Sequence, residues 1–299
     1  MVYDVIVIGG GPAGLTAAVY ARRADRSVLV LEKGSFGGQI TFSPKVENIP
    51  GFPEISGTEF ADRFVGQALD LGADMESAEV LEVRPGDPMT VVTDDGSYQG
   101  KTVILATGAK HRTLGLPEEE SYIGNGISFC AVCDGAFYSG REVVVVGGGN
   151  SALQEALLLA DLCSRVTIVQ NLAFLTGEAK LQAQIAAREN VTILYETLVT
   201  GYLGEDGSLT GVVLEGPSGV TEMRTDGVFL AVGLIPQNEP FAALVPLKNG
   251  YVDADESCLT GTDGVFVAGD CRNKTVRQVA TACSDGAVAA LAACRYLDR

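Results

Sequence analysis

Short apolar runs alternate with glycine-rich turns and helical stretches along most of the chain. Near the N-terminus, the run Val5–Ile8 leads into a Gly-x-Gly-x-x-Gly turn, which is followed by a helical stretch and a second apolar run, Val28–Leu31. Short apolar runs bounded by glycine are typical of buried parallel strands. The pattern predicts a strand, a tight turn, a helix and a second strand, the order found in dinucleotide-binding units.

Each glycine of this turn has a separate predicted role. Gly9 makes the turn, Gly11 lets a pyrophosphate approach the backbone, and Gly14 lets the helix pack on the strand. Glu32 follows Gly14 by 18 residues, where a carboxylate can accept hydrogen bonds from a ribose. The helix N-terminus offers free N–H groups to the phosphates. The predicted cofactor-binding residues of this unit are Gly9, Gly11, Pro12, Ala13, Gly14 and Glu32.

The same pattern recurs about 138 residues later. The run Val143–Val146 leads into a Gly-x-Gly-x-x-Ala turn, a helical stretch and the run Val166–Val169. This internal repeat predicts a second dinucleotide fold. Its predicted binding residues are Gly147, Gly149, Asn150, Ser151 and Ala152.

Three further segments each read as a strand that enters a glycine turn: residues 102–110, 226–236 and 263–271. A long helix is predicted from about Arg277. The first fold therefore closes with C-terminal elements, and the second is inserted into it. We predict an α/β protein with two Rossmann-like dinucleotide-binding domains. The predicted boundaries are 1–114 with 239–299 for the discontinuous first domain and 115–238 for the second.

Charge and hydropathy exclude several classes of function. The 299 residues include 21 basic and 38 acidic side chains, a net charge of −17. Such a chain repels phosphate backbones and anionic lipids, so we expect neither nucleic acid nor a membrane as partner. No run of 18 apolar residues predicts a membrane span. The N-terminus has no basic start and enters a strand directly, which argues against a signal peptide.

The seven cysteines include one Cys-x-x-Cys pair, Cys130 and Cys133. A zinc site needs four ligands, but the chain has one histidine, His111, and no second pair. A static disulfide is unusual in the reducing cytoplasm that the odd cysteine count favours. We therefore expect no metal and interpret the pair as a redox couple. Asp134 follows it, either as a proton donor to a leaving thiolate or as a cap of the turn. His111 is expected to be solvated.

Taken together, the motifs resemble the low-molecular-weight thioredoxin reductase family. They are GGGPAG, GGQI (37–40), VENIPGF (46–52), ATGA (106–109), CAVCDG, GGGNSA, AGD (268–270) and RQVATA (277–282). The resemblance covers nearly the whole chain. It implies a cytoplasmic homodimer that binds FAD in the first fold and passes electrons through Cys130 and Cys133 to a thioredoxin-like protein disulfide. It also implies a rotation between the domains during the cycle.

The resemblance assigns further residues to the flavin. Gly38, Gln39 and Asn48 are expected beside the ring, and Asp270 at the ribityl chain. The N-terminus of the helix near Arg277 and Gln278 would stabilise an anionic reduced flavin. The other FAD-binding positions carried by the ATGA and AGD motifs are Thr107, Gly108 and Gly269.

The second fold departs from the family where NADPH is held. Members that use NADPH follow the second strand with His-Arg-Arg-x-x-x-Arg, whereas this chain has Gln170, Asn171, Leu172 and Thr176. No acidic residue ends the strand for NADH. The sequence resembles a branch that takes electrons from ferredoxin or another flavin, and the second site would then hold a second flavin or nothing.

Several alternatives remain open at this point. They are a conventional NADPH-dependent thioredoxin reductase, with NADPH held by residues such as Lys180, a dithiol oxidase coupled to O₂, and a non-enzymatic FAD-binding redox sensor. A ferredoxin donor, usually acidic, would need a local basic patch. The candidates for that patch are Arg22, Arg23 and Arg26, or Lys110 and Arg112.

Overall fold

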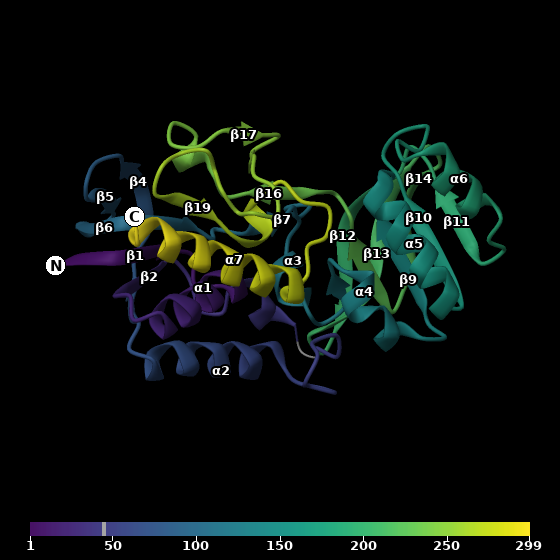
Figure 1. The fold of residues 1–299 in the computed structure, drawn as a ribbon. Helices are drawn as coiled ribbons and strands as arrows, with labels where there is room; N and C mark the ends of the chain where they lie inside the picture. The colour runs from purple at the N-terminus through teal and green to yellow at the C-terminus, as the bar shows by residue number, and fades with distance from the viewer. Residues whose placement is uncertain (44–45) are drawn as a thin grey trace. The chain divides into compact units, whose positions relative to one another are not determined.

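A computed structural model describes residues 1–43 and 46–299, which form two compact units (Figure 1). Unit 1 contains residues 1–43, 49–110 and 235–299, and unit 2 contains residues 46–48 and 111–234. Unit 2 is thus nested in the sequence of unit 1, and the α/β fold with a nested second unit agrees with the predicted class. The chain changes unit at 110/111 and 234/235, four residues before each predicted boundary. The functional assignment of 1–114 with 239–299 and of 115–238 stays a prediction.

A seven-stranded sheet forms the centre of unit 1 within the described residues. Its order is β3-β2-β1-β6-β5-β4, with β19 also paired to β6. The pairs among β1, β2, β3, β6 and β19 are parallel, and β4 and β5 extend the sheet antiparallel. The strands are β1 (Val2–Ile8), β2 (Val28–Glu32), β3 (Asp74–Ser77), β4 (Val80–Arg84), β5 (Met89–Thr93), β6 (Ser97–Leu105) and β19 (Val265–Val267).

Helices α1 (Pro12–Arg23) and α7 (Val279–Leu297) lie side by side in unit 1, with α2 (Gly57–Asp70) next to α1 (Figure 1). A Cβ atom at Gly286 would lie only 2.2 Å from the carbonyl oxygen of Ala13, so the close approach of α7 to α1 requires glycine there. The remaining elements are η1 (Gly38–Phe42), η3 (Glu239–Phe241), β17 (Leu247–Lys248), β18 (Tyr251–Val252) and η4 (Gly269–Cys271).

Unit 2 has a parallel sheet in the order β11-β10-β9-β15-β8 and an antiparallel sheet of β12, β13 and β14. Its strands are β8 (Ile127–Ser128), β9 (Glu142–Val146), β10 (Arg165–Val169), β11 (Val191–Leu194), β12 (Leu198–Glu205), β13 (Ser208–Gly216), β14 (Gly219–Arg224) and β15 (Gly227–Leu230). Its helices are α3 (Glu119–Tyr122), α4 (Ala131–Asp134), η2 (Gly135–Tyr138), α5 (Asn150–Leu162) and α6 (Ala179–Ala186).

Two of the places where the chain changes unit, 110/111 and 234/235, lie in strands that pair with each other. These are β7 (Ala109–His111) and β16 (Leu234–Pro236), which form a two-stranded sheet. The predicted strands are confirmed as β1, β2, β6, β9, β10, β15 and β19, and the predicted C-terminal helix as α7, which begins one residue after Gln278. Within the described residues, no helix is both long and apolar enough to cross a membrane.

Candidate active site

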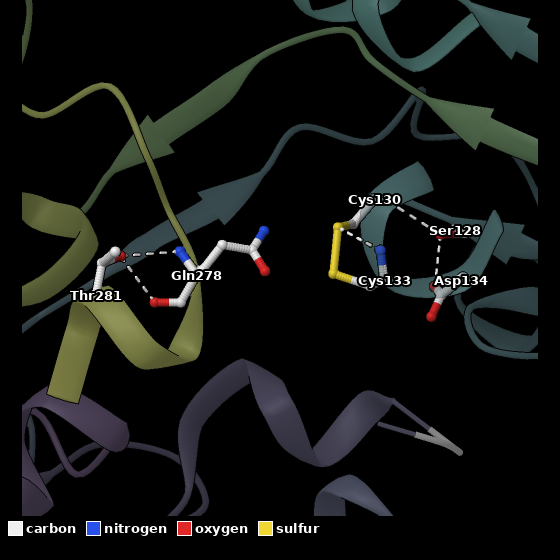
Figure 2. The surroundings of a disulfide bond; sticks show 6 residues. All are labelled: Ser128, Cys130, Cys133, Asp134, Gln278 and Thr281. Atoms are coloured by element: carbon white, nitrogen blue, oxygen red, sulfur yellow. Dashed lines mark hydrogen bonds between the residues drawn. A yellow bond between two sulfur atoms is a disulfide. The ribbon is translucent and has the colours of Figure 1, made fainter. Parts of the chain in front are cut away.

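Cys130 and Cys133 are joined by a disulfide on unit 2, with their Cα atoms 5.3 Å apart (Figure 2). Cys130 is the N-cap of α4, and its sulfur accepts a hydrogen bond of 3.2 Å from the N–H of Cys133. Val132, between the two cysteines, is 64% exposed. The disulfide therefore sits on a single helical turn whose outer face is open to solvent. Within the described residues, no cluster of three or more His, Cys, Asp or Glu side chains could hold a metal.

Asp134 follows Cys133 directly and is the last residue of this turn. One oxygen of its carboxylate, Oδ2, accepts a hydrogen bond of 2.6 Å from the hydroxyl of Ser128, and that hydroxyl accepts the N–H of Cys130 at 3.1 Å (Figure 2). Its other oxygen, Oδ1, is buried and has no hydrogen-bond partner within the described residues. Burial raises the pKa of Asp134, and the bond from Ser128 opposes that rise only in part. The side chain makes no capping bond at the start of η2, which favours the interpretation as a proton donor over that as a turn cap.

His111 is not the solvated side chain that the sequence predicts. Its ring stacks on the ring of Phe129, the residue before Cys130, with centroids 4.6 Å apart and planes at 19°. Burial lowers the pKa of His111 to about 4. The aromatic partner is separated from His111 by 18 positions, and no local pattern of residues indicates the contact. The histidine is therefore neutral at physiological pH.

The glycine turn of unit 1 has the geometry that its predicted role requires. Gly9 has a φ of +112°, and a Cβ there would lie 2.2 Å from the carbonyl oxygen of Ala106. Gly11 faces Gly38, since a Cβ on Gly38 would lie 3.0 Å from the Gly11 Cα. Glu32 accepts the N–H of Gly10 at 2.7 Å. The predicted residues of the turn, the strand end and the GGQI motif are thus brought together within unit 1, and only small residues fit there.

Asp270 supplies the clearest test of whether the residues of unit 1 fit a bound group. Its Oδ1 atom is buried and has no hydrogen-bond partner within the described residues, and burial raises its pKa. A buried carboxylate oxygen without a donor is costly unless a bound group supplies one. The hydroxyls of a ribityl chain are donors of that kind. The residues present therefore fit FAD at the position that the family resemblance predicts.

Asn238 joins two of the predicted flavin segments, although no motif in the sequence selects it. It is fully buried. Its Oδ1 accepts the hydroxyl of Thr107 at 2.9 Å, and its Nδ2 donates to the carbonyl oxygens of Gly250 and Cys271. Gly108, with a φ of +70°, follows Thr107 directly. Asn238 therefore fixes the ATGA turn next to the AGD turn.

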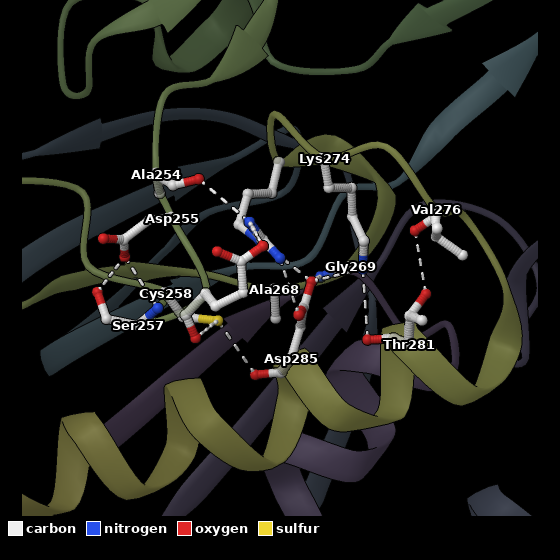
Figure 3. A network of polar contacts seen from close by, with 12 residues as sticks. Ala254, Asp255, Ser257, Cys258, Ala268, Gly269, Lys274, Val276, Thr281 and Asp285 are labelled. Carbon is white, nitrogen blue, oxygen red and sulfur yellow. Dashed lines mark hydrogen bonds and ion pairs between the residues drawn. The ribbon is translucent and has the colours of Figure 1, made fainter.

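A buried ionic cluster supports the segment after Asp270 (Figure 3). Asp285 on α7 accepts hydrogen bonds from Arg272 at 3.2 Å, from Lys274 at 2.8 Å and from the N–H of Gly269 at 3.1 Å. The side chains are 9%, 3% and 5% exposed for Asp285, Arg272 and Lys274. Burial alone would raise the pKa of Asp285, but the bonds from the two cations outweigh it and hold the pKa below its ordinary value. The cluster ties the turn to the middle of α7.

The N-terminus of α7 is shaped by a reciprocal cap. The side chain of Gln278 accepts the N–H of Thr281. The hydroxyl of Thr281 in turn accepts the N–H of Gln278 at 3.2 Å, as Figure 2 shows. Arg277 lies over the ring of Tyr251, 4.3 Å from its centroid, and its Nε donates to the carbonyl oxygen of Asp270. Both predicted residues are thus held in defined positions. Gln39 donates to the carbonyl oxygen of Ala109 in the same unit.

Asn48 belongs by its contacts to unit 2 rather than unit 1. Its predicted contact with the flavin stays a prediction. Of the basic residues expected to form a patch, Arg22 donates to the carbonyl oxygens of Leu71 and Arg26. Arg26 forms an ion pair with Asp298. This candidate patch is therefore partly neutralised.

The glycine turn of unit 2 repeats that of unit 1. Gly147 has a φ of +128°, and a Cβ there would lie 2.6 Å from the carbonyl oxygen of Ala231. Gly149 is the N-cap of α5. The backbone of this turn therefore has the geometry of the first turn, and the binding of a second dinucleotide there stays a prediction. The side chain of Asn150, however, is bonded to Glu178. Its Nδ2 donates to the Glu178 carboxylate, and its Oδ1 accepts the N–H of Glu178.

The loop after β10 closes over this second turn. The N–H groups of Thr176 and Gly177 bond the carbonyl oxygen of Gly148 at 2.8 and 2.9 Å. Gln170 is buried, and its side chain lies 2.5 Å from the position that a Cβ of Gly148 would take. Its Nε2 donates to the carbonyl oxygen of Phe174 at 2.9 Å. The side chain of Gln170, at the end of β10, therefore stabilises the loop that follows it.

Comparison with known proteins identifies the family. The model of the pyridine nucleotide-disulphide oxidoreductases matches residues 3–286. The chain belongs to the low-molecular-weight thioredoxin reductase family within that group. A thioredoxin reductase of Bacillus subtilis is 40% identical over 99% of this chain and 95% of its own length. The crystal structure of thioredoxin reductase from Streptococcus pyogenes is 38% identical, with a TM-score of 0.95 over 99% of this chain and 98% of that one.

One further relative, from Clostridium pasteurianum, is known as a 34.2 kDa protein in a rubredoxin operon. It is 41% identical over 98% of this chain and 97% of its own length. Members of the family are flavoprotein disulfide oxidoreductases, so this chain is an enzyme of that class. The family relationship does not distinguish a ferredoxin-linked or flavin-linked branch from one that uses NADPH.

Proposed function

We propose that this enzyme is an FAD-dependent, thioredoxin reductase-like disulfide oxidoreductase whose substrate is a thioredoxin-like protein disulfide. The observation that carries the proposal is the half-buried Cys130–Cys133 disulfide, on a turn whose Val132 is exposed and whose last residue is Asp134. The glycine turn, Glu32 and Asp270 of unit 1 would hold FAD. When bound there, FAD supplies the two-electron carrier between an external donor and the disulfide.

The residues of the chain account for the exchange step. A thiolate of the reduced pair attacks the substrate disulfide, and a mixed disulfide forms while one substrate sulfur leaves as a thiolate. Asp134 is placed to protonate that thiolate because burial keeps its pKa raised. The second enzyme thiol then attacks the mixed disulfide, which releases the reduced substrate and restores the Cys130–Cys133 bond.

We propose in addition that NADPH is an inefficient donor and that ferredoxin or another flavin serves instead. No Lys or Arg lies between Arg165 and Lys180, and the buried Gln170 amide binds its own loop rather than facing outward. Each lost charged hydrogen bond to a 2′-phosphate is worth about 1.5–3 kcal/mol. Two such losses would weaken NADPH binding by roughly 10² to 10⁴. The second site would then hold a second flavin or no nucleotide.

Anaerobic bleaching of the flavin tests both parts of the proposal. NADPH, NADH and reduced ferredoxin are added in turn to the holoenzyme, and the flavin absorbance is followed by stopped flow. We expect slow bleaching with both pyridine nucleotides and rapid bleaching with ferredoxin. Rapid bleaching by NADPH would identify a conventional NADPH-dependent thioredoxin reductase. Reoxidation by O₂ that outpaces thioredoxin reduction would indicate a dithiol oxidase, and a flavin that never exchanges electrons with the pair would indicate a sensor.

Cellular location and assembly complete the proposal. We place the enzyme in a reducing cytoplasm because all five cysteines outside the disulfide are free, four of them buried. We expect a homodimer, as the family resemblance implies. Light scattering on the purified holoenzyme tests this expectation, and a monomer at micromolar concentration would contradict it.

A further inference from the structure

Unit 2 contains two carboxyl groups that each leave one buried oxygen without a partner among the described residues. They are Oδ1 of Asp134 and Oε2 of Glu155. Asp134 ends α4, directly after the redox cysteines, and Glu155 lies in the middle of α5. Glu155 has no role in the exchange chemistry described above. A buried carboxyl oxygen without a donor is costly, so its presence behind a redox disulfide calls for a reason.

The packing of α5 places Glu155 toward the turn that carries Asp134. Glu155 and Leu159 are four residues apart and share one face of the helix. The Cδ2 atom of Leu159 lies 3.3 Å from the position that a Cβ of Gly135 would take, and Gly135 follows Asp134. The face of α5 that carries Glu155 therefore packs against the end of α4.

The electrostatics of the two groups are linked. Burial and, to a smaller extent, the charge of Asp134 together raise the pKa of Glu155 to about 8. Burial also raises the pKa of Asp134. Two neighbouring carboxyl groups in a poorly solvated place do not both ionise readily. At neutral pH this pair therefore retains a proton.

The other titratable groups on the elements around α5 do not change this assignment. Tyr138 on η2 and Cys163 at the end of α5 stay protonated, because burial raises their pKa values to about 12 and about 11. The charged side chains on the neighbouring β9, β10 and α6 are exposed to solvent: Glu142, Arg165 and Lys180.

We propose that Glu155 is a positioning residue for disulfide exchange, which keeps a proton beside Asp134 and supplies it to Asp134 for each transfer to a departing thiolate. The O–H proton of Glu155 passes to the Asp134 carboxylate, and the proton on Asp134 passes to the substrate sulfur as the substrate S–S bond breaks. Water then reprotonates Glu155, which restores the starting state of the pair. These are proton transfers only, and the electron pairs move between sulfur atoms as described above. The proposal rests on the proposed function, because it assigns Glu155 to the same exchange step.

The test compares two small disulfides that differ in the basicity of the leaving thiolate. The reduced holoenzyme is mixed with hydroxyethyl disulfide, whose thiolate needs a proton, or with an aromatic disulfide such as 5,5′-dithiobis(2-nitrobenzoate), whose thiolate does not. Re-formation of the Cys130–Cys133 bond is followed by quenched flow and mass spectrometry from pH 6 to 9. We expect Glu155→Gln to slow the first reaction about tenfold at pH 7 and to remove its inflection near pH 8. The second reaction should keep its wild-type rate.

Matched variants separate this role from a structural one. Glu155→Asp retains an acid and should restore part of the rate, whereas Gln154→Ala, an exposed neighbour on α5, should leave both profiles unchanged. The double variant Cys130→Ser/Cys133→Ser gives the background from the other thiols. If Glu155→Gln and wild type have the same profile with hydroxyethyl disulfide, the inference is wrong. Failure of the wild-type pair to react with either disulfide would instead contradict the proposed function.

An infrared measurement tests the proton itself without any turnover. The wild-type holoenzyme at pH 7 should show the C=O stretch of a protonated carboxyl group that is absent from Glu155→Gln. Titration of that band should follow a pKa near 8. An ionised Glu155 throughout this range would overturn the inference, whatever the activity of the enzyme.

Discussion

Gln170 occupies in unit 2 the place that Glu32 occupies in unit 1. Each residue follows the last apolar position of the second strand and lies against the middle residue of a glycine turn, Gly148 or Gly10. The carboxylate of Glu32 accepts the N–H of Gly10, whereas the amide of Gln170 donates to a carbonyl in its own loop. The two units thus share the same backbone arrangement, but this position carries an anionic acceptor in unit 1 and a neutral amide donor in unit 2.

This difference predicts that NADPH use can be built into the second unit. The substitutions Asn171→Arg, Leu172→Arg and Thr176→Arg add cations at three exposed positions of the loop. We expect the combined variant to lower the KM for NADPH by about 10² or more, since each charged bond to phosphate contributes about 1.5–3 kcal/mol. Steady-state kinetics with NADPH and NADH measure the effect. Arginines at the exposed positions Leu198, Val220 and Thr221 add equal charge elsewhere and should leave the KM unchanged.

The proposed role of the cysteine pair predicts that a cysteine variant loses disulfide reduction but keeps its bound flavin. Cys133→Ser should abolish reduction of a thioredoxin-like disulfide, because a single thiol cannot complete the exchange. The flavin should remain bound, since the glycine turn, Glu32 and Asp270 all lie in unit 1. Activity assays and the flavin-to-protein absorbance ratio check the two properties. Residual turnover above one percent of wild type would contradict the assignment.

Asp134 and Ser128 should differ in the size of their effects. Asp134→Asn removes the proton donor, and we expect a loss of about 10² in kcat. Ser128→Ala leaves the carboxyl group in place but removes a bond that opposes the rise of its pKa. The acidic group that governs the pH–rate profile should therefore titrate at higher pH in Ser128→Ala. A downward displacement would contradict this prediction.

The raised pKa of Glu155 predicts a pH-dependent gain in stability for Glu155→Gln. The folded protein binds this proton more tightly than the unfolded chain, so wild-type stability falls as pH rises from about 4.5 to about 8. Glutamine has no such penalty. At pH 8 the variant should be more stable than wild type by up to about 4 kcal/mol, and near pH 4 the two should be similar. Urea unfolding at the two pH values measures the difference, and Gln154→Ala serves as the control.

Asp285 should show the opposite dependence. Its pKa is lowered in the folded state, so its contribution to stability is present above the ordinary pKa of 3.8 and is lost as pH falls below that value. Asp285→Ala leaves Arg272 and Lys274 buried without their anion, and we expect a cost of about 3–5 kcal/mol at pH 7. Flavin release should also be faster, because the cluster supports the turn of Asp270. The exposed Asp255→Asn provides the matched control.

The sequence predicted the strands and both glycine turns because each depends on residues close together in the chain. Apolar runs such as Val143–Val146 and the spacing of Gly9, Gly11 and Gly14 specify local backbone geometry directly. The link between Cys130 and Cys133 was also predictable, since the pair forms its own small ring, and its redox role stays a prediction. In these cases the chemistry and the spacing lie within one short segment.

The residues that sequence reasoning missed act through packing between distant segments. Glu155 is one of two acidic residues in a largely apolar helix, and its burial depends on how α5 lies against α4. Asn238 bonds both Thr107 and Cys271. These three residues lie in separate segments of the chain that no local sequence pattern relates. His111 was misjudged for the same reason, because neighbouring Lys and Arg residues suggested solvent while its ring faces Phe129.

The loop from Gln170 to Gly177 is held by bonds that it makes to itself and to the backbone of Gly148. Its fold needs no nucleotide to complete it. Under the proposed function, unit 2 carries the redox disulfide on a backbone that its own hydrogen bonds stabilise, without a pyridine nucleotide in its glycine turn. The electron donor can then differ between relatives while the groups that act on the substrate disulfide stay the same.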